Sequence, residues 1–226
     1  TDRCPEAAEF HMATKYCPGS GSTCSSDWVN CFEASVIESV LPPSPVPWAE
    51  FTVEGSKDTL EGHPVLVIDL DDDSKNKNEL VPAGHQLLCE ISAGAVEAFR
   101  PDHTASWSAL SLGTAGYDWI DLGKLEEIKP LISQRLMRLK TEGCQGLVLT
   151  DLTCNEDDEC VVASGGQAAA DSKLSAYAEW LLDYTSSIGL MTGVRGVTST
   201  SVLAHSSKID FAISSSCVGN GNCAIL

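Results

Sequence analysis

Short apolar runs recur along the chain, and each of them ends in small or charged residues. The run VLVIDL, within residues 63–70, is continuously apolar up to its acidic end, as expected for a strand that is buried on both faces. Residues 87–91 repeat this pattern, and the small residues Ser92 and Gly94 then break the strand. A buried strand that delivers small and charged residues at its carboxyl end is how α/β barrels build their sites.

Similar runs place strands at intervals along most of the chain. The expected strands are residues 48–53, 63–70, 87–91, 119–122, 147–149, 189–194 and 209–213. Apolar residues at helical spacing predict a helix over residues 125–140, with Pro130 in its first turn, and a second helix that Asp171 caps. The apolar face of the second helix is Leu174, Tyr177, Leu181 and Tyr184. Alternating strands and helices predict an α/β fold.

Residues 1–47 are a different kind of sequence, and we expect them to form a Cys-rich segment separate from a barrel domain over residues 48–226. Glycine, serine and proline surround the cysteines, and the run LPPSPVP forms a stiff, extended connector. The gaps between the cysteines are too wide for a typical zinc site, so two disulfides within the segment are the simplest interpretation. These cysteines are Cys4, Cys17, Cys24 and Cys31.

Composition narrows the classes of function. Ten cysteines favour an oxidising compartment and therefore a secreted, extracellular or cell-surface protein, and no apolar run is long enough for a membrane span. The net charge of -18 argues against nucleic acid as a partner and fits a cationic one, although it is equally explained by solubility. We expect neither a metal nor a cofactor, because the five histidines are scattered and no phosphate-binding loop is present.

Three motifs lie in the order found in a known family. The stretches CEISAGAVEAFRPD, WIDL and IDFAISSSC resemble those of glycoside hydrolase family 114, the endo-α-1,4-polygalactosaminidase-like TIM barrels, and the resemblance extends over residues 48–223. It implies a TIM-like (β/α) barrel. Because family members continue with a further helix and an eighth strand, the barrel is expected to be incomplete at its C-terminus.

The resemblance also implies a set of residues that line the substrate site. They are Trp48, Asp69, Ser92, Gly94, Glu97, Arg100, Asp102, Trp119, Asp121, Asp151, Arg195 and Ser215. Structural salt links are an equally good interpretation of Arg100 and Asp102.

The two carboxyl groups that glycosidases use are missing from the positions where the family carries them. The family's aspartate falls on Thr150 and its glutamate on Ser215, while a Lys-Asn pair is replaced by Arg195 and Gly196. Asp151 follows one residue later, and alternation along a strand points it to the other face unless a bulge re-aims it. We therefore assign no catalytic residue.

Six more cysteines lie in the barrel region. Cys154 and Cys160 bracket an acidic loop and predict a local disulfide, and the resemblance implies a bridge between Cys217 and Cys223. The two that are left over are either free and buried or bonded to each other. They are Cys89 and Cys144.

These observations lead to a secreted, catalytically degenerate relative of the family that acts as an extracellular structural or carbohydrate-binding protein. The alternative is an active endo-glycosidase that hydrolyses α-1,4-linked galactosamine-rich polysaccharide, with Asp151 as one carboxylate. Seven strands in a fold that needs eight leave an open edge. Residues 27–39 of the same chain or a segment of a neighbouring copy would cover this edge, and the second arrangement predicts a homo-oligomer or filament.

Overall fold

A computed structural model describes residues 9–10, 46–51, 65–71, 85–114 and 116–213. The strands are β1 (Glu9–Phe10), β2 (Val46–Phe51), β3 (Val65–Ile68), β4 (Gln86–Ser92), β5 (Gly146–Thr150), β6 (Met191–Arg195) and β7 (Phe211–Ile213). The α-helices are α2 (Ala105–Ser108), α3 (Leu125–Thr141), α4 (Asp158–Ser164), α5 (Gln167–Ser187) and α6 (Thr200–Leu203). Short 3-10 turns are η3 (Leu122–Lys124), η4 (Cys154–Glu156) and η5 (Ser206–Lys208).

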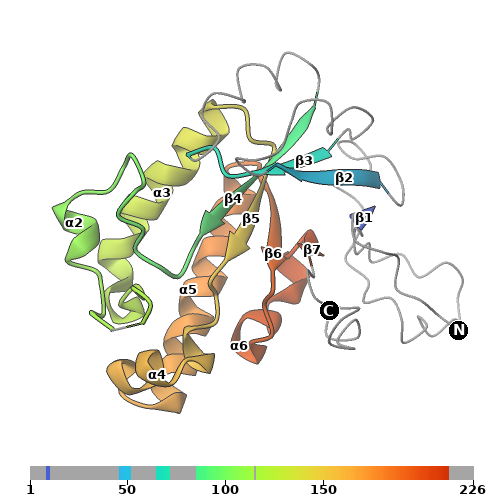
Figure 1. Cartoon of the computed structure of the whole chain (residues 1–226). Coiled ribbons are helices and arrows are strands. Elements are labelled where there is room, and N and C mark those ends of the chain that lie inside the picture. The colour runs from blue at the N-terminus through green and yellow to red at the C-terminus, as the bar shows by residue number, and fades with distance from the viewer. Residues whose placement is uncertain (1–8, 11–45, 52–64, 72–84, 115, 214–226) are drawn as a thin grey trace, which may run out of the picture.

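The strands form one sheet in sequence order (Figure 1). From β2 to β7 every neighbouring pair is parallel, and helices connect the later strands. This arrangement is the α/β fold that the alternating pattern predicts, with the TIM-like architecture that the family resemblance implies. Among the described residues β7 pairs with β6 alone, so the described part of the barrel is open.

The two faces of the sheet are both apolar, which explains the continuous hydrophobic runs of the sequence. Alternate residues such as Leu87, Cys89 and Ile91 of β4 share one buried cluster with residues of α3 and α5. The intervening residues form a second cluster on the inner face. Its members are Val65, Val67, Leu88, Val148, Met191, Phe211 and Ile213.

The two long helices lie close to their expected positions, with two local corrections. α3 begins at Leu125, so Pro130 lies in its second turn rather than its first. α5 begins at Gln167 after Gly166, and Asp171 is therefore not its cap. The Asp171 carboxylate instead accepts hydrogen bonds from the side-chain amides of Asn155 (2.7 Å) and Gln167 (3.1 Å).

The prediction of a strand at residues 119–122 is wrong. Trp119 and Ile120 form only isolated antiparallel bridges, to Ala95 and Ser111 respectively. The bridge partners lie in the connection that leads from β4 to α3, so the segment folds back on its own loop instead of joining the sheet. A short apolar run cannot distinguish these outcomes, because both bury the same side chains.

Two disulfides join described residues. The predicted local bridge between Cys154 and Cys160 is confirmed. Cys89 and Cys144 are bonded to each other, with their Cα atoms 5.8 Å apart, which selects one of the two states left open by the sequence. The other six cysteines, and with them the remaining expected bridges, lie outside the described residues.

The outer edge of β2 is partly covered by the chain's own N-terminal region. β1 pairs antiparallel with β2, placing Glu9 opposite Pro47. Residues 27–39, which were expected at an open edge, lie outside the described part. No helix in the described part is long and apolar enough to cross a membrane.

Candidate carbohydrate site

The turn after β4 is held against the end of β5 by backbone contacts. The amide of Ala93 donates to the carbonyl of Thr150 (3.0 Å), and the hydroxyl of Ser92 accepts from the amide of Ala95 (3.2 Å). From α5, the buried phenol of Tyr177 donates to the carbonyl of Ala93 (2.6 Å). A Cβ atom on Gly94 would lie 1.8 Å from the carbonyl oxygen of Asp151. The small residue is therefore needed for the approach of another strand's backbone.

The backbone conformation of Asp151 departs from that of a strand. The residue follows β5 directly and has a φ of 61°, in the left-handed region that few residues other than glycine adopt, aspartate and asparagine being partial exceptions. The strict alternation of a strand therefore does not extend to Asp151. The hydroxyl of Thr150 donates a hydrogen bond to the Asp151 carboxylate (2.8 Å). The same hydroxyl oxygen lies 3.2 Å from the carbonyl oxygen of Ile91.

Tyr117 lies near both of these strand ends. The side chains of Asp151, Ser92 and Glu97 all act on the electrostatics of its phenol. Burial, then the charge and hydrogen bond of Asp151, raise the pKa of Tyr117 above its ordinary value, against the opposing hydrogen bond from Ser92. The residue is 41% exposed. We call Ser92, Glu97, Tyr117 and Asp151 the Tyr117 cluster.

Tyr117 was not among the residues expected from the sequence, whereas its neighbour Trp119 was. Trp119 is buried, and its ring supports that of Tyr117 at a centroid distance of 4.7 Å. The motif WIDL lies in the same segment as Tyr117. Only the tertiary fold shows that the exposed aromatic ring is two residues upstream.

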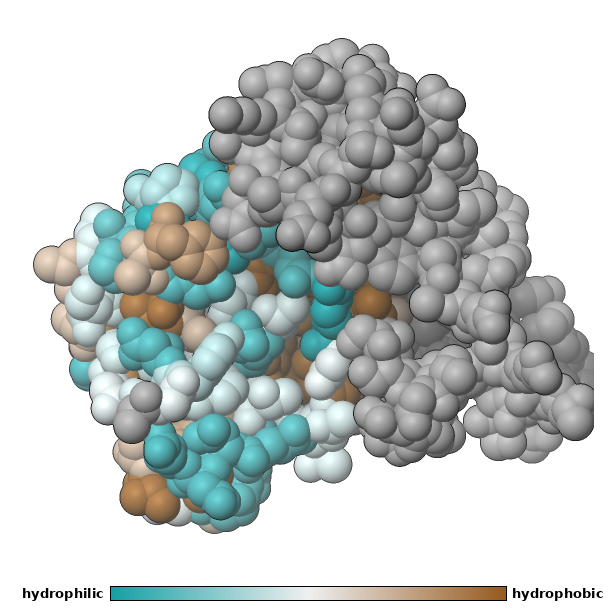
Figure 2. Space-filling view, viewed as in Figure 1, coloured by the Kyte–Doolittle hydropathy of each residue, from teal (hydrophilic) through white to brown (hydrophobic). Residues whose placement is uncertain are grey.

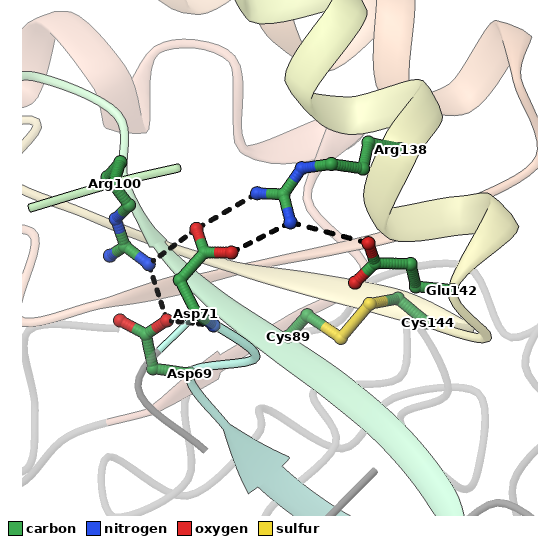
Figure 3. Close-up of a disulfide and its surroundings, with 7 residues drawn as sticks. All are labelled: Asp69, Asp71, Cys89, Arg100, Arg138, Glu142 and Cys144. Atoms are coloured by element: carbon green, nitrogen blue, oxygen red, sulfur yellow. Dashed lines mark hydrogen bonds and ion pairs between the residues drawn. A yellow bond between two sulfur atoms is a disulfide. The ribbon is translucent and has the colours of Figure 1, made fainter. Parts of the chain in front are cut away.

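Arg100 lies at the centre of a buried ionic network (Figure 3). Its guanidinium pairs with Asp69, with Asp71 (3.2 Å) and with Glu97 (2.8 Å). Asp71 also pairs with Arg138 of α3 (2.7 Å). Arg100 therefore acts as a salt link that joins the ends of β3 and β4 to the helix layer.

The network shifts the pKa values of two of its carboxyl groups in opposite directions. Burial would raise the pKa of Asp71, but the hydrogen bonds and charges of Arg138 and Arg100 outweigh it, and the pKa lies below its usual range. For Glu97, burial prevails over Arg100 and raises the pKa. Glu97 therefore retains its proton to a higher pH than an exposed glutamate does.

Asp102 and Asp121 have structural partners within the fold. Asp102 accepts two hydrogen bonds from the buried guanidinium of Arg135 (2.8 and 3.0 Å), which lies over the ring of Trp107. Asp121 caps η3 by accepting from the amide of Gly123 (3.0 Å). Neither contact places these residues in the Tyr117 cluster.

The remaining expected site residues are more dispersed. Arg195, at the end of β6, pairs with Glu90 of β4 (2.9 Å). Trp48 lies in β2 next to Val65 of β3, and Ser215 is outside the described residues. The fold thus brings together Ser92, Glu97 and Asp151, with Asp69 joined to them through Arg100.

A second exposed aromatic side chain lies beside Arg100, which pairs with Glu97 of the cluster. Phe99 is 58% exposed, and the guanidinium of Arg100 lies 4.7 Å from its centroid. Beyond β5, hydrophilic side chains cover the end of the molecule formed by α4 (Figure 2), which begins with Asp158 and Glu159. No group of His, Cys, Asp or Glu side chains in the described part is arranged to hold a metal ion.

The profile of Glycoside-hydrolase family GH114 matches residues 33–226, and no curated protein sequence matches the chain. Among solved structures, Ega3 of Aspergillus fumigatus, in complex with galactosamine, is similar with a TM-score of 0.61 and 18% identity over 79% of this chain and 70% of that one. The glycoside hydrolase domain of PelA from Pseudomonas aeruginosa is similar with a TM-score of 0.53 and 15% identity over 74% and 66%.

Proposed function

The chain belongs to glycoside hydrolase family 114, and we propose that it is an extracellular protein that binds an amino-sugar polysaccharide at the Tyr117 cluster without hydrolysing it. The observation that carries the proposal is the partly exposed Tyr117, on whose phenol the charges of Asp151 and Glu97 both act. A galactosamine unit has an ammonium group, which carboxylates bind, and a face of C–H groups, which packs on an aromatic ring. The disulfides favour an oxidising compartment.

Two further facts support a cationic sugar as the ligand. The similar structure of Ega3 contains galactosamine. The net charge of -18 attracts cations at long range and speeds their association. A partly de-acetylated galactosamine polymer is a polycation, so it fits both the galactosamine in the similar structure and the negative charge of this chain.

The absence of hydrolysis is proposed from the two positions where the family carries its carboxyl groups. One is Thr150, a neutral side chain engaged with Asp151, and the other is Ser215. A hydroxyl group cannot act as a general acid near neutral pH. The pair of carboxyl groups that glycoside hydrolysis requires is therefore lost from those positions.

The first test is the affinity for α-1,4-linked galactosamine oligosaccharides, measured by calorimetry. Asp151→Asn keeps the size and the tolerance for a left-handed backbone but removes the charge, so we expect about tenfold weaker binding. Glu126→Gln is the matched control, because it removes one exposed carboxylate from α3. Equal affinities for Asp151→Asn and the wild type would contradict the assignment of the ligand to the Tyr117 cluster.

The second test compares the binding of a long oligosaccharide with the binding of galactosamine itself. The ring of Phe99 is backed by Arg100, which three carboxylates hold in place, so it offers a rigid apolar face to a further sugar unit. Phe99→Ala should weaken binding of a long oligosaccharide about fivefold and leave galactosamine itself unaffected. Met137→Ala, which removes an exposed side chain from α3, should change neither. An equal loss for the monosaccharide and the oligosaccharide would exclude Phe99 as a separate contact.

A hydrolysis assay on the same polymer separates binding from catalysis. We expect the wild type to release no oligosaccharide, because losing one carboxyl group alone typically slows such chemistry about a hundredfold or more. The second candidate function, an active endo-glycosidase, is favoured by the left-handed backbone of Asp151, which ends the strict alternation of β5 at this carboxylate. Release at an ordinary enzymatic rate that Asp151→Asn abolishes would establish this second function.

A further inference from the structure

The disulfide between Cys154 and Cys160 lies just beyond the Tyr117 cluster. Cys154 follows Asp151 by three residues and begins η4, and Cys160 lies in α4. The carboxylate of Asp157 accepts from the amide of Cys160 (2.8 Å) and caps α4. The bridged segment is therefore a short, fixed unit at the end of β5.

This bridge packs directly on Trp119. Trp119, Cys154 and Cys160 form a separate buried cluster against which Leu112 packs, and the three residues are 6%, 3% and 0% exposed. The backbone of Trp119 is fixed as well, because its carbonyl accepts from the amide of Leu112 (2.8 Å). The indole ring is thus held between its own loop and the disulfide.

Trp119 in turn holds Tyr117. Their ring centroids are 4.7 Å apart, and the amide of Trp119 donates to the carbonyl of Tyr117 (3.0 Å). On the other side of Tyr117, the amide of Gly116 donates to the carboxylate of Glu159 in α4 (3.4 Å). The bridged segment therefore supports the tyrosine from both sides in the sequence.

We infer that the Cys154–Cys160 disulfide is a positioning element that fixes the side chain of Tyr117 through Trp119. A bridge that only stabilises its own loop would lower the melting temperature without moving Tyr117. The two roles therefore differ in what happens to the phenol, and this difference can be measured without a ligand.

The ligand-free experiment is a tyrosine titration followed by phenolate absorbance, with circular dichroism to check that the fold persists at each pH. In the wild type, burial and Asp151 hold the pKa of Tyr117 above its ordinary value of about 10. In Cys154→Ala/Cys160→Ala one additional tyrosine should titrate near that ordinary value, and Tyr117→Phe should remove the difference. Val162→Ala, an exposed change in α4, should resemble the wild type. Unchanged titration in the cysteine variant would overturn the inference.

A second variant covers the case in which the cysteine variant does not fold. Trp119→Leu keeps the disulfide and an apolar side chain but removes the ring that links the bridge to Tyr117. It should release Tyr117 to titrate in the same way. A folded Trp119→Leu protein whose Tyr117 titrates as in the wild type would also overturn the inference.

The binding experiment rests on the proposed function and uses galactosamine oligosaccharide as the probe. Removing the bridge and Tyr117→Ala should each weaken binding about tenfold, and the combined variant should be no weaker than either one, because both act through the same ring. Losses that multiply would contradict the inference. If the wild type does not bind the probe, the proposed function fails, while the titration still decides the role of the bridge.

Discussion

Replacing Gly94 with alanine should lower the free energy of unfolding by more than about 3 kcal/mol and abolish oligosaccharide binding. The new Cβ atom would lie 1.8 Å from the carbonyl oxygen and 2.9 Å from the carbonyl carbon of Asp151. Both atoms belong to the backbone, so no flexible side chain can move aside. The carbonyl of Gly94 also accepts from the amide of Ile120 (2.9 Å), which restrains the turn from its other side.

Urea unfolding with a calorimetric binding assay measures both effects. Gly116→Ala is the matched control, because a Cβ atom there meets no atom within 4 Å and the residue lies in the same loop as Tyr117. This control should unfold like the wild type. A Gly94→Ala protein of wild-type stability would show that β4 and β5 do not approach each other as closely as the structure indicates.

Replacing Arg100 with leucine should cost about 3–5 kcal/mol of unfolding free energy at neutral pH. The side chain of Arg100 is 3% exposed and pairs with Asp69, Asp71 and Glu97. Its removal leaves these carboxylates in a partly buried region with less positive charge. Arg138 continues to neutralise Asp71, so the penalty falls mainly on the other two.

The loss of unfolding free energy in Arg100→Leu should depend on pH, and the direction of this dependence follows from the pKa shifts of Asp71 and Glu97. Asp71 has a lowered pKa in the folded protein, so its contribution to stability is present above its unfolded pKa and disappears as the pH falls. Glu97 has a raised pKa, so its charged form destabilises the fold at neutral pH and protonation relieves this cost. Without Arg100 that cost increases. The stability difference between variant and wild type should therefore be largest near pH 7 and shrink toward about pH 4.

The control for this experiment is an exposed ion pair. Lys129 pairs with Glu126 of the same helix at 2.6 Å, and the carboxylate is 82% exposed. Lys129→Leu should change the unfolding free energy by less than about 0.5 kcal/mol. If Arg100→Leu costs no more than this control, the network does not hold β3, β4 and α3 together.

The sequence by itself determined most of the layers of this protein. Continuously apolar runs predicted β3 and β4, because strands covered on both faces have no polar side. The spacing of Leu174, Tyr177 and Leu181 predicted the buried face of α5, and the short interval between Cys154 and Cys160 predicted their disulfide. Motifs in the order of a known family indicated the barrel and located the turn at Ser92. All of these signals are local, and local periodicity reports which side of an element is buried.

Other features were decided only by the tertiary structure. The segment at Trp119 pairs with its own loop rather than the sheet, and Cys89 of β4 bonds to Cys144, which lies just before β5. The left-handed backbone of Asp151 lies where the turn after β4 approaches the end of β5, and the charge of its carboxylate acts on Tyr117. Each of these outcomes joins residues that are distant in the sequence. Such contacts depend on strand register and on backbone approach across the sheet, and neither is encoded in the hydrophobic pattern of a single segment.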